Sequence, residues 1–458
     1  MTVKALLKNM VPKKIRNLRH LFFAWWGSVQ YKNPSKSLFV IGVTGTSGKS
    51  TTIHFLRQML EGAGFTVGSL STIDFSVAGI QQLNDKKMTM LGKTAIQKFL
   101  RDMVEAQCDI AIIETTSEGR VQHRHRWIAY DAMIITNLYE EHIESHGSFE
   151  NYKQAKKDIF SYVSSLAPKN KSGLSKTLQK AWSGETVPKV FVLNTSMPQV
   201  KEFYDCSVGE KYLCTVAGEK KYFTPNTADR ELILDTVCTK KEGISFTLNK
   251  KDITTASIFG EFNAMNVTLG IAMLQEFGIS LEQCIHLIKK IASPPGRVEF
   301  IQEAKQHGFT AIVDYAFEPV AISGLYEIVS RLAPKRVIHV FGSTGGGRDV
   351  SRRFSVGRLV GTKADICVVT NDDPYDDDPE KIIADIVSAA LDVGKRIDET
   401  CFAITDRANA IQKAVTLAKE GDVVLITGKG SEQAMVFENG RMEPWDDREE
   451  VRKAIAMR

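Results

Sequence analysis

The stretch 38-LFVIGVTGTSGKST-51 joins a short apolar run to a loop of glycine, serine and threonine. The apolar run, residues 38–43, is typical of a strand buried in a parallel sheet, and residues 53–60 beyond the loop have helical spacing. Glycines let backbone N–H groups close around phosphate oxygens, and the start of a helix favours an anion. The stretch therefore predicts a phosphate-binding loop between a central strand and a helix.

The polar side chains of this loop suit a nucleotide and its metal. Lys49 supplies a positive charge for the β- and γ-phosphates, and a hydroxyl at Ser50 or Thr51 can reach Mg²⁺. The general pattern G-x-x-x-x-G-K-[ST] needs glycine where this chain has Val43, so the loop is of a variant type. The expected nucleotide ligands are Gly45, Thr46, Ser47, Gly48, Lys49, Ser50 and Thr51.

Strand-like and helix-like patterns alternate along the rest of the chain, on both sides of Ser293-Pro-Pro-Gly296, which is a candidate linker. Alternation of this kind predicts parallel sheets with ligands at the carboxyl ends of the strands. The fold class expected is α/β, with a P-loop-type central ATPase domain on a mostly parallel sheet and then a Rossmann-like C-terminal domain. The expected divisions are 1–36, 37–295 and 296–458. The strand patterns fall at residues 109–113, 132–135, 190–193, 244–248, 310–313, 336–341, 366–369 and 423–426, and further helical patterns at 264–277 and 281–291.

The 458 residues, enough for two or three domains, carry a net charge of +5 that is unevenly spread. Ten basic residues precede the first acidic residue, Glu61, and the rest of the chain has a net charge of −5. Binding to nucleic acid is therefore not expected. The seven cysteines are odd in number, widely spaced and without a CxxC pair, which is typical of a reducing cytoplasm. No apolar run reaches the ~20 residues that span a bilayer.

Two motifs together resemble a known family. Residues 44–50, TGTSGKS, are similar to the TGTNGKT loop of the Mur ligases. The second motif is more specific, and consists of Thr136-Asn137-Leu138, Glu141-His142, His146-Gly147, Glu150-Asn151-Tyr152 and Lys156. It resembles the MurE-type branch, the UDP-N-acetylmuramoyl-tripeptide synthetases, and the similarity extends over about residues 38–458. The resemblance implies an ATP-dependent ligase of peptidoglycan precursor synthesis, which activates a muramoyl-peptide-type carboxylate as an acyl phosphate, joins it to an amino acid and releases ADP and phosphate.

The resemblance also implies roles for individual residues. Lys156 matches the lysine that the family carbamylates with CO₂, so that a cation becomes an anion beside Mg²⁺. Asn263 and Asn266, which the resemblance places near the adenine, could instead cap a helix. Arg297 and Asp314, which it places at the phosphate and the ribose, could instead form an interdomain salt bridge. The implied catalytic residues are Lys49, Lys156, His142 and Arg297; the metal ligands Ser50, Glu114, His142 and Lys156; the further nucleotide contacts Asn137, Asn263, Asn266, Arg297 and Asp314; and the substrate contacts Thr89, Ser117, Arg348, Asp372, Asp373, Tyr375, Gly428 and Glu432.

One departure from the family concerns the amino acid that is added. The MurE-type motif DNPR, whose arginine selects diaminopimelate, reads Asp372-Asp373-Pro374-Tyr375 here. Five aspartates between residues 372 and 378 make this loop acidic, which favours an amino acid with a basic side chain such as lysine or ornithine. The alternative is a solvated acidic turn.

A second departure lies at the N-terminus. MurE-type enzymes hold the UDP moiety with a separate N-terminal domain, and the 36 residues before the first strand are too few for one. The acceptor could be UDP-linked or lipid-linked. Residues 1–33 combine basic and aromatic side chains, which predicts a peripheral membrane contact or, alternatively, a helix packed on the body. A monomer is expected. The remaining alternatives are a MurT-type or folylpolyglutamate-type ligase and a nucleotide-binding protein without catalysis.

Overall fold

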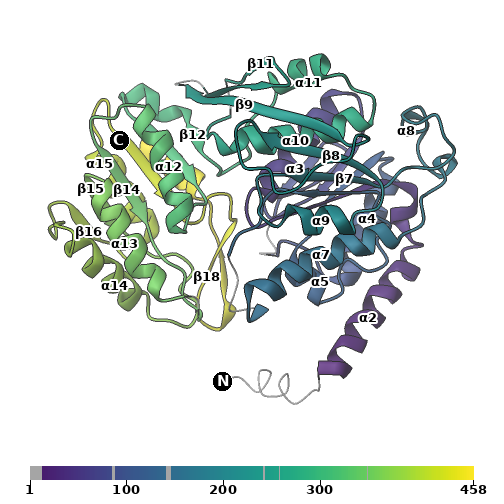
Figure 1. The fold of residues 1–458 in the computed structure, drawn as a ribbon. Coiled ribbons are helices and arrows are strands. Elements are labelled where there is room, and N and C mark those ends of the chain that lie inside the picture. The colour runs from purple at the N-terminus through teal and green to yellow at the C-terminus, as the bar shows by residue number, and fades with distance from the viewer. Residues whose placement is uncertain (1–12, 85–87, 141–145, 241–242, 257, 348) are drawn as a thin grey trace.

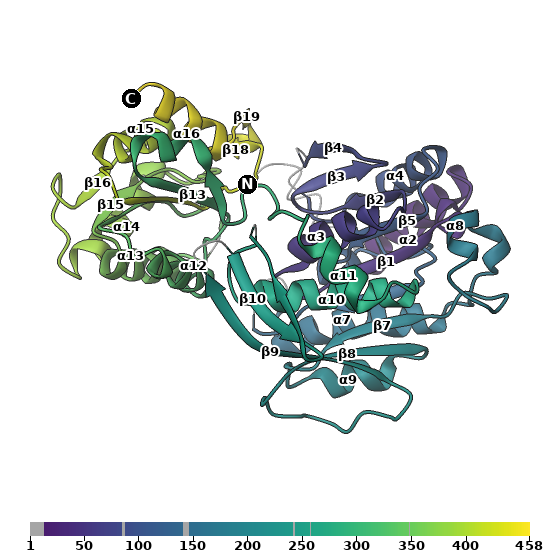
Figure 2. The same cartoon turned by 90° about the horizontal axis from the view of Figure 1, so that it is seen from above.

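The computed structural model describes residues 13–458 except 85–87, 141–145, 241–242, 257 and 348. Helices cover both faces of two separate sheets (Figure 1), one built by the purple-to-teal part of the chain and the other by the green-to-yellow part. Figure 2 shows the two sheets side by side, with the long strand β9 (Arg230–Lys240) reaching toward the second sheet.

The first sheet has eleven strands in the order β11-β10-β9-β8-β7-β6-β1-β5-β2-β3-β4. The seven strands from β9 to β2 run parallel, and antiparallel hairpins extend the sheet at both edges. The other strand bounds are β1 Phe39–Thr44, β2 Val67–Leu70, β3 Asp74–Val77, β4 Ile80–Leu83, β5 Ile110–Glu114, β6 Ala132–Ile135, β7 Val190–Asn194, β8 Glu210–Val216, β10 Gly243–Leu248 and β11 Lys251–Thr254.

Strand β1 lies at the centre of this sheet, and every one of its residues is buried. Its alternate side chains point to opposite faces: Ile41 and Val43 join one apolar core, and Val40 joins the other. Parallel pairing sets Val43 opposite Glu114 on β5 and Ile134 on β6. The residues just beyond these three strands therefore meet at one edge of the sheet, where the phosphate loop begins.

The second sheet has six strands in the order β12-β13-β17-β14-β15-β16, of which only β12 is antiparallel to its neighbour. A separate hairpin pairs β18 with β19. The bounds are β12 Glu299–Ile301, β13 Thr310–Asp314, β14 Val337–Phe341, β15 Ile366–Val369, β16 Cys401–Ala403, β17 Val423–Thr427, β18 Ala434–Val436 and β19 Met442–Pro444.

The helices that cover the sheets begin with α2 and end with α16. The α-helices are α2 Lys13–Gln30, α3 Lys49–Gly62, α4 Lys93–Glu105, α5 Ser117–Val121, α7 Phe149–Ser165, α8 Lys176–Gln179, α9 Val200–Cys206, α10 Phe262–Glu276, α11 Leu281–Ile288, α12 Pro319–Arg331, α13 Ser351–Lys363, α14 Pro379–Leu391, α15 Arg407–Leu417 and α16 Asp447–Ala456. The 3₁₀ helices are η1 Pro34–Ser37, η2 Lys171–Gly173, η3 Gln302–His307 and η4 Glu438–Gly440. Among the described residues, no helix is long and apolar enough to cross a membrane.

The predicted α/β class and mostly parallel first sheet are confirmed, and the strands predicted at 132–135 and 366–369 match to the residue. The sequence did not single out β8 or β9. Exposed and buried residues are mixed along β9, so it carries no continuous apolar run of the kind that marks β1.

A buried ion pair ties the start of β1 to neighbouring parts of the first sheet. The Asp131 carboxylate is fully buried and accepts hydrogen bonds from Val40 N at 2.9 Å, Lys169 Nζ at 2.5 Å and Lys189 Nζ at 3.4 Å. Burial lowers the pKa of Lys169 to about 8, although Asp131 opposes the shift. Removing the carboxylate would leave two largely buried ammonium groups without their counter-ion.

We predict that Asp131→Ala lowers the free energy of unfolding by about 3–5 kcal/mol in urea titrations, because breaking a buried pair leaves uncompensated charge. The matched control is Asp102→Ala, which breaks the exposed pair of Lys98 and Asp102 and should cost about 0–1 kcal/mol. Equal losses in the two variants would contradict this account of the Asp131 cluster.

Candidate functional site

The phosphate loop passes so close to its neighbours that two of its residues have no room for a side chain. A Cβ on Gly45 would lie 1.9 Å from Thr136 Oγ1, and one on Gly48 would lie 2.8 Å from Asn266 Oδ1. Both glycines also have positive φ, 149° and 76°. Gly48 is the N-cap of α3, so the loop opens onto a helix N-terminus as the sequence predicts.

Asn137 holds the loop from the turn after β6. Its Oδ1 accepts hydrogen bonds from Thr46 N at 3.1 Å and Ser47 N at 2.9 Å, and its Nδ2 donates to Ser47 O at 3.2 Å. Thr136 Oγ1 adds a bond of 2.6 Å to Ser47 O. The amide of Asn137 therefore fixes the backbone of the loop.

Two lysine side chains donate hydrogen bonds to backbone carbonyls of the loop. Lys49 Nζ donates to Thr46 O at 2.8 Å, and Lys156 Nζ, from α7, donates to Gly45 O at 2.8 Å. Lys156 is buried, and its Nζ lies 4.5 Å from the centre of the Tyr152 ring. Tyr152 in turn donates to Thr46 Oγ1 at 3.2 Å. The predicted Lys49 and Lys156 thus meet at one loop although they lie 107 residues apart in the sequence.

A buried carboxylate stands next to the start of α3. Glu114 ends β5, and its Oε2 accepts hydrogen bonds from Ser50 Oγ at 2.8 Å, Thr72 N at 2.7 Å and Thr72 Oγ1 at 3.0 Å. Carboxylate and hydroxyl oxygens are the ligands that Mg²⁺ prefers. Glu114 and Ser50 therefore fit the metal role that the sequence assigned to them. His142, the third expected ligand, lies outside the described residues.

Thr72 is the residue of this group that the sequence did not indicate. It lies just beyond β2 and donates to Glu114 with both its backbone N–H and its hydroxyl. Its Oγ1 also lies 3.0 Å from Oγ1 of the predicted substrate residue Thr89. Ser117, another predicted substrate residue, is buried in the first turn of α5. A threonine outside every recognised motif has no signal in the sequence, because its role depends only on the neighbouring strands.

The two asparagines of α10 pair with each other beside the loop. Asn266 Nδ2 donates to Asn263 Oδ1 at 2.8 Å, and Asn266 Oδ1 accepts from Thr52 Oγ1 at 3.2 Å. The N-cap of α10 is Glu261, so capping does not explain Asn263, which donates instead to Phe259 O at 2.7 Å. A cleft of about 280 Å³ opens next to the start of α10 and is lined by Thr239, Gly260, Glu261, Phe262, Gly324, Glu327, Ile328, Ser330 and Arg331.

Arg297 and Asp314 lie together at the start of the second sheet. Asp314 ends β13 and accepts from Val298 N and Ala316 N, each at 2.7 Å. Burial raises the pKa of Asp314, and the charge of Arg297 opposes the shift. The Arg297 guanidinium lies 4.1 Å from the centre of the Tyr315 ring, and its Nε is buried without a hydrogen-bond partner among the described residues.

Lys429, in the turn after β17, is the centre of a cluster of carboxylates. Its fully buried Nζ donates to Asp373 Oδ1 at 2.8 Å and to Glu432 Oε2 at 2.5 Å. Asp372 is buried beside them, and burial raises its pKa to about 6 although Lys429 opposes the shift. Gly428 has no room for a side chain, since a Cβ there would lie 2.4 Å from Asp372 Oδ2.

The acidic loop 372–378 uses much of its charge within the fold. Asp377 pairs with Arg353 at 3.1 Å, and Asp378 caps α14 by accepting from Glu380 N at 2.9 Å. Tyr375 N donates to Val436 O at 3.2 Å, which attaches the loop to the hairpin of β18. The loop is therefore an ordered part of the fold, and not a solvated turn. Arg348, the remaining predicted substrate residue, lies outside the described residues.

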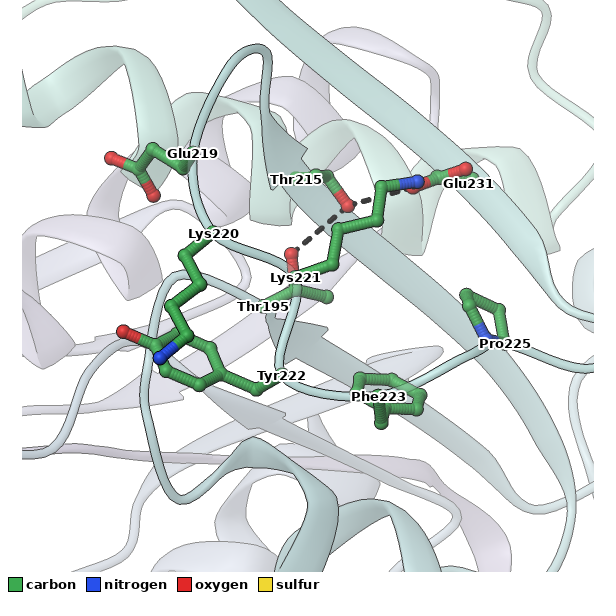
Figure 3. Close-up of a pocket in the computed structure, with 9 residues that line it drawn as sticks. All are labelled: Thr195, Thr215, Glu219, Lys220, Lys221, Tyr222, Phe223, Pro225 and Glu231. Carbon is green, nitrogen blue, oxygen red and sulfur yellow. Dashed lines mark hydrogen bonds and ion pairs between the residues drawn. The ribbon is translucent and has the colours of Figure 1, made fainter.

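A second recess contains none of the predicted site residues. Figure 3 shows it beside the ends of β7 and β8, where Thr215 Oγ1 lies 2.9 Å from Thr195 Oγ1 and 3.0 Å from Glu231 Oε1. Lys221 pairs with Glu231 at 3.6 Å. The polar side chains of this recess therefore bond to one another. A substitution here can serve as a control for substitutions near the phosphate loop.

Family models match both parts of the chain. Residues 43–274 match the Mur ligase middle domain, and residues 296–430 match the Mur ligase glutamate ligase domain. The chain belongs to the Mur ligase family. Members of this family are ATP- and Mg²⁺-dependent ligases that form an amide bond and release ADP. The similarity to this family that the motifs indicated is thereby confirmed.

Curated relatives share about 30% of their residues with this Mur ligase. A UDP-N-acetylmuramyl-tripeptide synthetase from Roseiflexus sp. is 32% identical over 431 residues, 93% of this chain and 80% of the relative. The synthetase of the same name from Borrelia garinii is 31% identical over 95% of this chain and 80% of its own length. A diaminopimelate ligase from Clostridium acetobutylicum is 28% identical over 98% of this chain and 85% of its own length.

Solved structures agree on the fold. A UDP-N-acetylmuramoyl-L-alanyl-D-glutamate–2,6-diaminopimelate ligase superposes with a TM-score of 0.57 at 24% identity, covering 92% of this chain and 79% of that one. A folylpolyglutamate synthase from Mycobacterium tuberculosis gives a TM-score of 0.65 at 16% identity, covering 89% and 92%. Because the sequence identity to both structures is below 25%, these similarities show only that the fold is shared.

We predict that Thr72→Val raises the Mg²⁺ concentration needed for half-maximal ADP release by about tenfold or more, because partners that orient a metal ligand carry that much affinity. The control is Thr195→Val in the recess of Figure 3, which also removes hydroxyl contacts and should leave the Mg²⁺ dependence unchanged. An unchanged Mg²⁺ dependence in Thr72→Val would argue against a metal beside Glu114.

Proposed function

We propose that this Mur ligase adds an amino acid to the terminal carboxylate of a muramoyl-peptide-type substrate in peptidoglycan precursor synthesis. The observation that supports it most is the contact between Ser50 Oγ and Glu114 Oε2 at 2.8 Å, directly beside the loop of Gly45 and Gly48. Curated relatives named as tripeptide synthetases cover nearly the whole chain. These relatives favour this function over a MurT-type or folylpolyglutamate-type ligase.

The proposed reaction has two steps. A carboxylate oxygen of the muramoyl peptide attacks the γ-phosphorus of ATP, the bond to the bridging oxygen breaks, and ADP leaves. The amino group then attacks the carbonyl carbon of the acyl phosphate, phosphate leaves, and the nitrogen gives up a proton. Lys49 and the N-terminus of α3, which begins just after Gly48, stabilise the phosphate charge. Bound Mg²⁺ would neutralise further charge on the phosphates, held by Glu114 and Ser50.

Lys156 has the surroundings for a carbamate. In that reaction the unprotonated amine bonds to the carbon of CO₂ and releases one proton, so a buried cation is replaced by an anion. A buried ammonium is costly, and next to a divalent ion it would also be repelled. Lys156 Nζ lies 2.8 Å from Gly45 O of the loop, and in this proposal its carbamate would add an anion to Ser50 and Glu114 in holding Mg²⁺.

The second sheet and helix α10 supply groups that would meet the nucleotide. Arg297 has a buried Nε without a partner among the described residues, as expected of a guanidinium that awaits an anion. Asp314 would contact the ribose and Asn263 the adenine. In this proposal residues 37–295 and 296–458 act as two units around the linker at 293–296. The chain works as a monomer with residues 1–33, of which 1–12 lie outside the described residues, in peripheral contact with a membrane.

The cluster around Lys429 points to a basic amino acid. Asp372, Asp373 and Glu432 surround Lys429. The second buried cation beside these aspartates, Arg407, is paired with Asp447 at 2.7 Å, so carboxylates exceed cations in the cluster. The α-ammonium group and a cationic side chain of the incoming amino acid would both be attracted there. Tyr375 stands where the arginine of the diaminopimelate-selecting motif would be.

We expect lysine or ornithine to support faster ADP release than diaminopimelate at equal concentrations, with a UDP-linked and a lipid-linked muramoyl dipeptide as parallel acceptors. Glu432→Gln should raise KM for the amino acid by about tenfold, because a hydrogen bond to a charged group is worth roughly 1.5–3 kcal/mol, and should leave KM for ATP unchanged. Glu443→Gln, in an exposed pair on β19, is the control. A preference for diaminopimelate would refute the assignment.

We predict that Lys156→Ala abolishes ADP release and that short carboxylic acids restore part of it, because they can replace the carbamate anion. ¹³CO₂ should give the unaltered protein a carbamate NMR signal that Lys156→Ala lacks. Lys157→Ala is the matched control, since this neighbour pairs with Glu202 at 2.9 Å on the outside of α7. Full activity in Lys156→Ala would rule out the carbamate.

A further inference from the structure

The large apolar side chains that the described surface exposes are concentrated on one helix. Nineteen such residues are exposed, and six of them fall between residues 18 and 29 of α2. A single exposed leucine or tryptophan is ordinary, but a contiguous apolar patch marks a surface that contacts something else. The six are Leu18, Phe22, Phe23, Trp25, Trp26 and Val29, between 43% and 73% exposed.

These side chains form one continuous face. Leu18, Phe22, Trp25 and Val29 are spaced by four, three and four residues, the spacing of a stripe along one side of a helix. Aromatic rings connect along it, since Phe22 lies 6.0 Å from Trp25 and 6.3 Å from Trp26 between ring centres. The stripe is therefore a preassembled apolar surface.

The opposite face of α2 is fixed to the protein. Ala24, Gly27 and Ser28 are buried, and a Cβ on Gly27 would lie 3.0 Å from Thr94 Cα at the start of α4. So close a contact leaves no freedom for α2 to turn its aromatic face inward. Figure 1 shows α2 at the edge of the molecule, extending beyond the helices that cover the first sheet.

The charge around this face is positive. No acidic residue precedes Glu61, whereas Lys13, Lys14, Arg16 and Arg19 all belong to α2. Further cations stand near the contact with α4 and α5, because burial and the charges of Lys93, Arg19, His123 and Arg124 lower the pKa of His20 to about 4. A second copy packed through α2 would bring two segments of the same positive charge together, which disfavours a dimer through this helix.

We propose that α2 lies along the surface of an anionic lipid bilayer, with its aromatic stripe at the boundary of headgroups and acyl chains. Tryptophan and phenylalanine beside lysine and arginine are the composition of an interfacial helix, and basic residues near an anionic leaflet strengthen its binding. The inference names the surface that the proposed membrane contact uses, and it rests on that proposal for its setting but not on any catalytic step.

Binding of α2 to a bilayer would hold the substrate-binding side of the proposed active site near the membrane. Gly27 of α2 touches the first turn of α4, and a few residues before α4 stands Thr89, which reaches Glu114 through Thr72. This short path favours an acceptor whose muramoyl peptide is carried by a lipid diphosphate over one carried by UDP.

The test is sedimentation of the full chain with vesicles of phosphatidylcholine, with and without about a third phosphatidylglycerol. We expect the chain to sediment with the anionic vesicles only. Replacing Phe22, Trp25 and Trp26 together by serine should reduce binding at least about tenfold, since each aromatic side chain contributes on the order of 1 kcal/mol or more on burial. The matched control replaces Ile80, Val208 and Val320 by serine, three apolar side chains exposed elsewhere, and should bind as the unaltered chain does.

A second variant and a second measurement distinguish a loss of membrane binding from misfolding of the aromatic variant. Arg19→Gln combined with Lys14→Gln keeps the aromatic stripe and should weaken binding to anionic vesicles with a shallower salt dependence. Tryptophan fluorescence should be quenched by bromine-labelled lipids in the unaltered chain, and this quenching should fall when Trp25 and Trp26 are replaced. Equal sedimentation of the aromatic and control variants, or a vesicle-independent dimer that the aromatic variant disperses, would overturn the proposal. None of these readouts requires ligase activity, so they stand apart from the test of the proposed reaction.

Discussion

The close passage of the phosphate loop beneath the turn after β6 is the constraint on which the site depends. With only 1.9 Å between an added Cβ on Gly45 and Thr136 Oγ1, the loop cannot shift without losing the Asn137 contacts to Thr46 and Ser47. That placement brings Ser50 onto Glu114 and Lys156 onto Gly45 O. One backbone approach therefore aligns the nucleotide, metal and lysine positions together.

Parallel pairing explains why these residues meet although they are far apart in the chain. Strands β5, β1 and β6 are neighbours in register, so the loops at their carboxyl ends emerge at one edge of the sheet. Thr72 joins them because β2 pairs parallel with β5. The buried Asp131 cluster at the opposite ends of the strands has no chemical role in the proposed reaction and holds β1 in place.

In the second sheet most of the acidic side chains near the proposed site are already paired with cations or hydrogen-bond donors of the fold. Around Lys429 the carboxylates are buried and partly compensated, so the acidity that the sequence shows at residues 372–378 is not an exposed patch. Asp377 and Asp378 stabilise Arg353 and α14, whereas Asp372 and Asp373 stay beside Lys429. Counting charges along the sequence overstates the acidity available to a substrate, because it cannot show which carboxylates are already paired.

The sequence by itself determined the family, the α/β class, the phosphate loop and most of the polar residues around it, since glycine, lysine and asparagine at fixed spacing carry their own chemistry. It also showed that the N-terminal segment is basic and aromatic. Only the tertiary structure decided that Thr72 supports Glu114, that Asn263 is not a helix cap, and that Arg297 lies on Tyr315 with an Nε that has no partner among the described residues. It also decided which side of α2 is exposed, because Gly27 fits only against α4. These features arise from contacts between distant strands and helices, for which no local pattern of residues leaves a signal.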